Sequence, residues 1–396
     1  MKWEKVKLGD VCEITSSKRI FYSEYVDDGV PFYRSKEIIE SDEGKAIENP
    51  LYISVDKYNE IKEKFGVPQT GDMLLTSVGT IGIPYIIKKK DCFYFKDGNL
   101  TWFRDFREGL NSKYLYYWIK SSEGTGTLYN TTIGSSQKAL TISALKNIKV
   151  SLPPRSVQDK IVEVVSVYDD LIENNQKQIK LLEEAAQRLY KEWFVDLRFP
   201  GHENTKIVDG VPEGWNEKTL SQVADVIMGQ SPKSEFYNSE KKGLPFHQGV
   251  GSYGVRFVMD DIYSTSYTRI AEPNSILFSV RAPVGRLNVT KNKIVIGRGL
   301  AAINQTDGCQ SYLYYLLKNR FFKDNIVGNG SIFASVSKDE LLNQKFLIPE
   351  RNLMMQFEKI VSQMDKQIEN LDSKNKKLIE ARDRLLPKLM SGEVEV

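Results

Sequence analysis

The chain has 396 residues, of which 41% are hydrophobic, and this is enough for two or three domains with real cores. Its 55 basic residues nearly balance its 52 acidic ones, so the net charge is +3. That balance is compatible with nucleic-acid binding, although a protein that holds DNA by charge alone would be more basic. No apolar run is long enough for a transmembrane helix, and the opening Met1–Glu4 is not typical of a signal peptide.

Cysteine and histidine are too few and too scattered for most metal or triad chemistry. Cys12, Cys92 and Cys309 are odd in number and far apart, which fits a reducing compartment and offers no metal framework. The histidines are His202 and His247, so neither a zinc site nor a histidine-based triad is expected. No nucleophile–base pair or carboxylate dyad stands out. We therefore expect a cytoplasmic chain without catalytic, cofactor-binding or metal-binding residues.

The first globular region is predicted over residues 1–150. Short β-rich runs alternate with Gly- and Pro-containing turns, which predicts a strand-rich α/β domain with a few helices. Tyr114–Lys120 has the spacing of a short amphipathic helix, and its tyrosines are expected in the core rather than stacked on bases.

Two features of this region favour DNA contact. The tight loop 77–82 combines small and β-branched residues, and the lysine run 88–90 is a point-charge cluster that suits phosphates. Charge runs are, however, usually just solvated. The candidates here are Arg34, Ser77, Thr80, Lys88, Lys89 and Lys90.

Residues 151–197 are predicted to form a central spacer helix. Apolar residues recur there in steps of three, four or seven, and Ser156 followed by Asp159 predicts a capping box at its start. About 40 residues at a rise of 1.5 Å give a helix on the order of 60 Å long. Such a helix cannot bury its apolar stripe against one compact domain, so it needs a partner helix.

A Pro/Gly-rich connector, residues 198–213, leads to a second globular region, residues 214–347. Its anchors repeat those of the first region: Trp215–Val223 resembles Trp3–Val11. The loops between the anchors differ strongly. That contrast is expected for two sites on one scaffold that read different things.

Arginine-bearing loops are the binding candidates of the second region. Loop 280–285 matches loop 77–82, and an arginine there can fork onto guanine O6/N7 or onto phosphates. The alternative is a surface turn with solvated arginines, and the sequence leaves both open. Gly249–Gly254 matches GxGxxG, but a strand-like run follows it, so we expect a loop and no dinucleotide site. The candidates here are Gln248, Arg281, Arg286 and Arg298.

A distal spacer helix is predicted over residues 348–396, and it repeats the central one. With an offset of 196 positions, Gly134–Phe194 lies over Gly330–Met390 without a gap. The first helix leads away from the first region, and the second would have to return, so we expect an antiparallel pair. The residues expected at the helix-pair and partner interface are Ile161, Val164, Tyr168, Leu171, Ile172, Leu182, Leu189, Phe357, Ile360, Met364, Ile368, Leu378 and Leu385.

Polar residues interrupt the apolar stripe near the middle of both helices. Asn174, Asn175 and Asn370 lie there, and a buried asparagine can fix helix register at some cost in stability. A simple solvated break in the stripe is an equally good interpretation.

The sequence around the helix ends is distinctive. The central helix leads into Lys191–Phe194 and then Phe199–His202, and the chain ends with Arg384–Val396. Together with two unlike regions on a shared skeleton, each followed by a long helix after a proline, this pattern resembles the specificity (S) subunit of type I restriction-modification enzymes. The resemblance covers essentially the whole chain.

The resemblance implies an α+β fold with two strand-rich α/β target-recognition domains, and two long helices forming an antiparallel coiled coil with pseudo-twofold symmetry. Each domain would read one half of a bipartite double-stranded DNA site. The helices would set the gap and dock two methyltransferase (modification) subunits, which restriction (translocase/nuclease) subunits join. S-adenosylmethionine, ATP and magnesium would belong to those partners, leaving this chain non-catalytic.

Three other functions remain open on the residues alone. A stand-alone bipartite DNA-binding regulator would use the same two readers, although it would hardly need such wide apolar helices. A methyltransferase in its own right would bind S-adenosylmethionine. A coiled-coil scaffold with protein-binding ends would fail to bind duplex DNA. The target bases and the gap length cannot be derived from the sequence.

Overall fold

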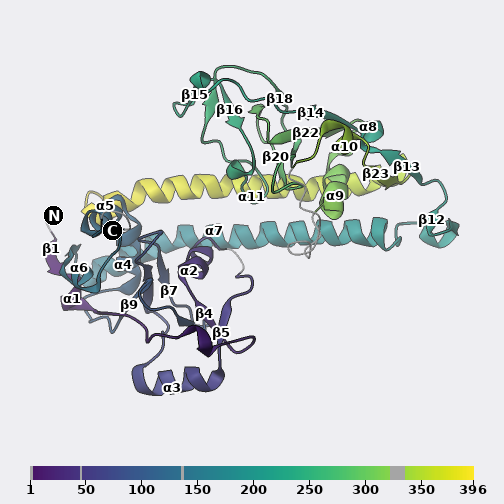
Figure 1. Cartoon of the computed structure of the whole chain (residues 1–396). Coiled ribbons are helices and arrows are strands. Elements are labelled where there is room, and N and C mark those ends of the chain that lie inside the picture. The colour runs from purple at the N-terminus through teal and green to yellow at the C-terminus, as the bar shows by residue number, and fades with distance from the viewer. Residues whose placement is uncertain (1–2, 45–46, 135–137, 322–334) are drawn as a thin grey trace. The chain divides into compact units, whose positions relative to one another are not determined.

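The computed structural model describes residues 3–44, 47–134, 138–321 and 335–396, so the repeat register at Gly330 lies outside the described residues. The chain divides into two compact units: unit 1 is Met1–Lys177 with Asp372–Val396, and unit 2 is Gln178–Leu371. The division falls within both long helices, α7 (Arg155–Tyr190) and α11 (Arg351–Ser391) (Figure 1). Each unit is therefore a globular part together with segments of both helices.

Unit 1 is built on two four-stranded sheets and a two-stranded ribbon. The ribbon pairs β1 (Glu4–Lys7) with β10 (Lys149–Leu152). One sheet has the order β2-β9-β6-β7 and the other β3-β5-β4-β8. Their strands are β2 (Glu13–Thr15), β3 (Tyr25–Val26), β4 (Val30–Tyr33), β5 (Leu51–Ile53), β6 (Met73–Thr76), β7 (Pro84–Ile86), β8 (Tyr94–Phe95) and β9 (Leu100–Arg104).

Helices fill the connections of unit 1 and carry much of its core. They are α1 (Leu8–Val11), α2 (Ser35–Asp42), α3 (Val55–Phe65), α4 (Ser112–Lys120), α5 (Ser122–Thr131) and α6 (Ile142–Asn147). The predicted helix at Tyr114–Lys120 is thus confirmed as α4. Tyr114, Tyr117 and Trp118 are buried in it, which confirms that its tyrosines belong to the core.

Unit 2 repeats this plan. The ribbon pairs β13 (Asn216–Thr219) with β23 (Lys345–Ile348), and a four-stranded sheet has the order β14-β22-β19-β20. A five-stranded sheet, β15-β17-β16-β21-β18, takes the place of the second sheet. The strands of these sheets are β14 (Ala224–Met228), β15 (Tyr237–Asn238), β16 (Leu244–His247), β17 (Tyr263–Ser264), β18 (Ile270–Ala271), β19 (Ile276–Ser279), β20 (Leu287–Val289), β21 (Ile294–Ile296) and β22 (Leu300–Gln305). Unit 2 also contains the hairpin of β11 (Ile207–Val208) and β12 (Val211–Pro212), and the helices α8 (Leu220–Val223), α9 (Gln310–Phe321) and α10 (Lys338–Leu342).

The registers of the two units correspond residue by residue. Thr76 pairs with Leu100 in unit 1, and Ser279 pairs with Leu300 in unit 2. The second sheets share one parallel pair each, β4 with β8 and β16 with β21, among otherwise antiparallel strands. The internal repeat is therefore a repeat of backbone hydrogen bonding, and the α+β class is confirmed.

Between the shared strands the units differ, because each inserts its own elements. Unit 1 places α2 and α3 between β4 and β6. Unit 2 has in that stretch a 3-10 turn, η5 (Val250–Ser252), followed by β17 and β18. The GxGxxG segment thus forms a short turn with no α-helix starting at Gly254, as expected.

In unit 1, the first part of α7 packs on the last part of α11. Ile161, Val162 and Val165 share one apolar cluster with Leu386 and Leu389. Arg382 Nη1 lies 2.6 Å from Asp169 Oδ1, and Asn175 Nδ2 donates to Asn375 Oδ1 at 2.8 Å. Residue numbers rise along one helix as they fall along the other, so these segments run in opposite directions.

Unit 2 contains the other halves of the two helices and packs them in the same way. Tyr190 and Trp193 lie edge-on to Phe357, with ring centroids 6.0 and 5.9 Å apart. Trp193 belongs to a π-helical turn, η2 (Lys191–Val195), that ends the helical run of α7. The buried Arg256 lies 3.8 Å from Glu183 on one helix and 2.8 Å from Asp365 on the other.

The start of α7 differs from the predicted capping box. The helix begins at Arg155, so Ser156 lies within its first turn. Asp159 instead accepts hydrogen bonds from Arg155 Nε at 2.8 Å and from Asn111 Nδ2 at 2.6 Å. The carboxylate ties the helix to the preceding domain, a long-range contact that the local pattern does not reveal. Within the described residues, no helix is both long and apolar enough to cross a membrane.

Candidate nucleic-acid interface

A tight loop follows an inner strand in each unit, and one hydroxyl holds it in both. In unit 1, Thr76 Oγ1 accepts from the Ile83 backbone N–H at 2.9 Å. In unit 2, Ser279 Oγ accepts from the Arg286 N–H at 2.8 Å and donates to the Pro283 carbonyl at 2.6 Å. The backbone closes identically, from Gly82 to Thr76 at 2.8 Å and from Gly285 to Ser279 at 3.0 Å.

The two predicted candidates on the unit 1 loop differ in burial: Ser77 is buried and Thr80 is exposed. Ser77 is buried, and its Oγ lies 2.6 Å from Thr101 Oγ1. Both Ser77 and the adjacent Thr76 are buried, so the strand end is covered on both faces and Ser77 has no exposed surface for DNA. Thr80 is exposed at the tip of the loop.

The arginines of the second loop both face solvent. The side chains of Arg281 and Arg286 are exposed, while their backbones take part in the hydrogen bonding of the loop. Arg281 forms a β-bridge with Ser335, and the Arg286 N–H donates to Ser279 Oγ. The loop thus presents two guanidinium groups from a fixed backbone. A guanidinium group presented in this way is suited to phosphate or base-edge contact.

The lysine run at Lys88, Lys89 and Lys90 is exposed and follows β7 closely. Its field reaches α7: the pKa of Glu173 is lowered first by its contact with Lys177 at 2.7 Å and then by Lys88 and Lys90. The run therefore forms a local positive area on unit 1.

Arg34, Gln248 and Arg298 occupy turns where parallel strand pairs end. Arg34 is bound to Glu37, with Nη2 to Oε1 at 2.6 Å and Nε to Oε2 at 3.2 Å. Gln248 and Arg298 are exposed, and both meet Ser231, whose Oγ donates to Gln248 Oε1 at 2.7 Å and accepts from the Arg298 N–H at 3.2 Å. The structure therefore places Gln248 and Arg298 side by side, whereas Arg34 is held in an ion pair with Glu37.

The predicted helix residues fall into three classes of burial. Phe357 and Ile368 are fully buried, whereas Leu171 and Ile360 are 45% and 42% exposed. The buried residues of the predicted set are Ile161, Ile172, Phe357 and Ile368, and the half-buried ones are Val164, Tyr168, Leu182, Leu189, Met364, Leu378 and Leu385. An exposed apolar side chain on a helix is available to a partner chain.

Sequence reasoning missed several residues that the fold places at these sites. Arg19 Nε lies 2.9 Å from Asp97 Oδ2, 78 positions along the chain. The Arg256 guanidinium lies 3.4 Å from the Tyr314 ring centroid. Arg19 could have been found by carrying the repeat alignment into the loops, whereas nothing local marks Arg256 as buried.

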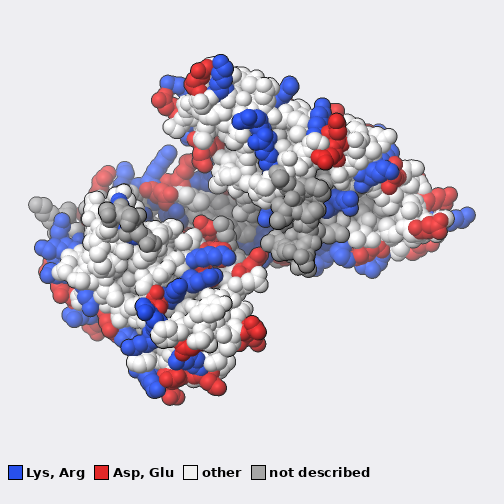
Figure 2. Space-filling view, viewed as in Figure 1, with Lys and Arg blue, Asp and Glu red and all other residues white. Residues whose placement is uncertain are grey.

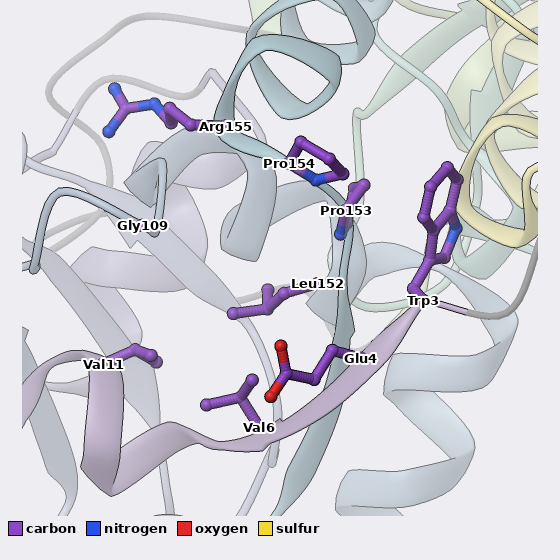
Figure 3. Close-up of a pocket in the computed structure, with 9 residues that line it drawn as sticks. All are labelled: Trp3, Glu4, Val6, Val11, Gly109, Leu152, Pro153, Pro154 and Arg155. Carbon is purple, nitrogen blue, oxygen red and sulfur yellow. The ribbon is translucent and has the colours of Figure 1, made fainter.

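No cluster suited to metal binding occurs among the described residues. A pocket of about 620 Å³ in unit 1 is lined by Trp3, Glu4, Val6, Val11, Gly109, Leu152, Pro153, Pro154 and Arg155. Figure 3 shows a largely apolar wall of Leu152, Val6 and Val11 with Glu4 and Arg155 on separate sides. None of the predicted DNA candidates lines it.

Surface charge is mixed on the face seen in Figure 2, where basic and acidic side chains alternate over both units. This agrees with the net charge of +3. On this face, DNA contact would therefore depend on particular side chains and not on one large basic surface.

Comparison with known proteins identifies relatives along the whole chain. Residues 1–184 and 212–381 match the family model described as type I restriction modification DNA specificity domain. The putative type I restriction enzyme MjaX specificity subunit of Methanocaldococcus jannaschii is 28% identical, covering 100% of this chain and 94% of that protein. The MjaIX specificity subunit of the same organism is also 28% identical, with the same coverages.

A solved structure shares the fold. The crystal structure of a type I restriction-modification system S subunit from M. genitalium covers 98% of this chain and 96% of that one, with a TM-score of 0.58 and 16% identity. The family model matches both repeats and most of both long helices. The chain belongs to the type I restriction-modification DNA specificity family.

Proposed function

We propose that this chain is the addressing subunit of a type I restriction-modification complex, with unit 1 and unit 2 each reading one half of a split DNA site. Membership of the DNA specificity family supports DNA recognition within an assembly of restriction-modification subunits. Specificity subunits of such systems carry no catalytic centre, so the chemistry lies in the partner chains.

One observation supports two readers above all: the units share a backbone frame and differ in what they expose from it. Equivalent hydroxyl groups, those of Thr76 and Ser279, close the loop in the two units. The exposed side chains on these loops include Thr80 in unit 1 and Arg281 and Arg286 in unit 2. A constant scaffold with changed exposed side chains is what two different half-sites require.

The long helices are proposed to form one antiparallel coiled coil that acts as the spacer between the readers. In each unit taken alone, α7 and α11 segments run in opposite directions and share an apolar core. The gap between half-sites would then follow from helix length, as half-site spacing follows from geometry in dimeric binders.

Exposed apolar residues on the helices are proposed to dock two methyltransferase subunits. Val167 and Leu171 are 53% and 45% exposed on α7, and Leu181 is 64% exposed. Ile360 is 42% exposed on α11. S-adenosylmethionine would be bound by those methyltransferase subunits, and ATP and magnesium by restriction subunits joined to them.

The test is a map of methylated adenines in DNA from cells that carry this chain with its methyltransferase subunits. We expect a motif of two short halves separated by a fixed gap. Replacing residues 1–150 by those of a relative should change one half and leave the other half and the gap intact. Sequence-specific DNA binding by the chain alone, with no methylation in any combination, would favour a stand-alone regulator.

A further inference from the structure

Three loop positions occupy equivalent places in the two units. In unit 1, β4 and β8 pair Tyr33 with Phe95, and the Lys96 N–H then donates to the Tyr33 carbonyl at 2.8 Å. In unit 2, β16 and β21 pair His247 with Ile296, and the Gly297 N–H donates to the His247 carbonyl, also at 2.8 Å. Arg34 follows Tyr33 as Gln248 follows His247, so Arg34 and Gln248 are equivalent. Asp97 follows Lys96 as Arg298 follows Gly297, so Asp97 and Arg298 are equivalent.

The third position lies in the loop after the first strand of the other sheet. Ile14 pairs with Phe103 in unit 1, and Val226 pairs with Ile303 in unit 2. Counting onward from those two residues, Arg19 corresponds to Ser231. The set in unit 1 is Arg19, Arg34 and Asp97, and the set in unit 2 is Ser231, Gln248 and Arg298.

Each set is a cluster in space. Arg19 Nε lies 2.9 Å from Asp97 Oδ2. Arg34 is equivalent to Gln248 by its place after Tyr33, and its side chain is bound to Glu37. In unit 2 the Ser231 hydroxyl contacts both other members, Gln248 through Oε1 and Arg298 through its N–H.

The two clusters occupy equivalent backbone positions, but they carry different side chains at those positions. The guanidinium that faces solvent comes from the first loop in unit 1, where the side chain of Arg19 is 69% exposed. In unit 2 it comes from the turn after β21, as Arg298. An acid in unit 1 thus takes the place of the base in unit 2. A cluster that merely stabilised the turn would not need an outward arginine.

The turns that carry the exposed groups are held firmly. A Cβ on Gly297 would lie 2.6 Å from Gln248 Oε1, and one on Gly299 would lie 2.5 Å from the Gln248 carbonyl oxygen. The turn can approach Gln248 this closely only because Gly297 and Gly299, on either side of Arg298, have no Cβ. In unit 1, Arg34 is not free to read bases, because Glu37 accepts from its Nε and its Nη2.

We propose that these equivalent clusters are the base-reading positions of the two units, with Arg19, oriented by Asp97, reading a guanine in one half-site. Arg298 reads a guanine in the other half, and Gln248, oriented by Ser231, reads an adenine there. An arginine fork matches guanine O6 and N7, and a carboxamide matches adenine N6 and N7. This rests on the proposed function.

The experiment uses the full chain in its complex with methyltransferase subunits, in cells whose methylated adenines are mapped. The variants are Arg298→Ala, Gln248→Ala and Arg19→Ala. Arg298→Ala should relax one guanine of one half-site, lowering discrimination at that base by about 10-fold or more. Arg19→Ala should relax one guanine of the other half, and each variant should leave the opposite half unchanged.

Charge-matched controls are Lys62→Ala in unit 1 and Lys338→Ala in unit 2, both exposed residues outside the clusters. They should leave the motif unchanged. A uniform loss of methylation in Arg19→Ala and Arg298→Ala, with every base of the motif retained, would assign phosphate contacts to these arginines and overturn the proposal.

A second pair of variants covers the case in which the alanine variants do not methylate at all. Arg19→Gln and Arg298→Gln replace the guanidinium with a carboxamide, which matches adenine and not guanine, so each should lose the preference for its guanine. A guanine preference kept in these variants would overturn the proposal. Failure of the proposed function is distinguishable, because the wild-type complex itself would then give no split motif.

Discussion

At the residue scale, Arg256 is a buried cation that contacts three parts of unit 2. Its side chain is 5% exposed, it lies 2.8 Å from Asp365, and it stacks at 3.4 Å on the Tyr314 ring. It therefore joins the globular part of the unit to the segment of α11 that the unit contains. Removing one partner of a buried ion pair leaves the other charge uncompensated.

Arg256→Ala should lower the free energy of unfolding by about 3–5 kcal/mol, since it strands Asp365 and Glu183 and opens space beside the ring. Urea titration monitored by circular dichroism measures this. Arg269→Ala, at an exposed position of the same unit, should change it by less than about 0.5 kcal/mol. Equal effects of the two variants would show that the buried contacts contribute nothing.

Glu37 makes unit 1 sensitive to acid. Burial raises the pKa of Glu37, but its hydrogen bonds with the Arg34 side chain and backbone outweigh this, so the pKa is lowered. The stabilisation is complete above the carboxyl's unfolded-state pKa of about 4.3 and is lost as the pH falls through the lower folded-state pKa.

Glu37→Gln should therefore flatten the loss of unfolding free energy between about pH 5 and pH 2 relative to wild type. Chemical unfolding at a series of pH values gives the slope. Glu63→Gln, an exposed change on α3, should keep the wild-type slope. An unchanged slope in Glu37→Gln would mean that the ion pair does not form in solution.

At the element scale, the duplicated loop depends on one buried hydroxyl in each unit. Thr76 and Ser279 are almost fully buried and satisfy backbone groups that face no water. An unsatisfied buried donor or acceptor costs about 1–3 kcal/mol.

Thr76→Val and Ser279→Ala should each lower the free energy of unfolding by about 1–3 kcal/mol. Amide hydrogen exchange should additionally show faster exchange at the N–H of Ile83 in the first variant and of Arg286 in the second. Thr80→Ala, at the exposed tip, serves as the matched control and should do neither. Slow exchange in the variants would mean that the backbone alone holds the loop.

The helix segments of unit 1 meet at a polar contact. Asn375 is 7% exposed and accepts from Asn175 at 2.8 Å. Of the asparagines noted in the polar centre, Asn175 makes this contact, and its partner Asn375 is not among them. A register set by one helix on another cannot be found by comparing each helix with its own repeat.

Asn375→Leu should cost about 1–3 kcal/mol of unfolding free energy by leaving Asn175 unpaired, whereas Asn175→Leu with Asn375→Leu should be nearly neutral or stabilising. A double-mutant cycle gives the coupling. Additive single effects would show that the two amides do not interact.

At the scale of the whole molecule, the proposed spacer ties helix length to the DNA gap. Seven residues add about 10 Å of helix with little rotation, which corresponds to about 3 base pairs. Inserting one heptad after Lys177 and another after Leu371 should therefore lengthen the gap of the methylated motif by about 3 base pairs with both halves retained.

The same heptad placed after Lys177 alone is the control, because unequal helices cannot keep both sets of contacts. It should abolish methylation. A gap that stays constant in the double insertion would show that the helices do not measure the distance between half-sites.

The sequence by itself determined the elements of this protein. Helical periodicity predicted both long helices, and an offset of 196 positions carried Asp169 onto Asp365, two carboxylates that bind arginines in their own units. Short apolar runs and turns predicted the strand-rich units. These properties depend on neighbours within a few residues or on a regular repeat, and both are visible in a linear chain.

The tertiary structure alone decided which side chains are available. Ser77 is turned inward, Arg34 is occupied by Glu37, and Arg19 is oriented by a residue 78 positions away. Asn175 finds its partner 200 positions away. Burial and pairing depend on how strands and helices pack, so the proposed DNA-reading residues could be named by type from the sequence but placed only by the fold.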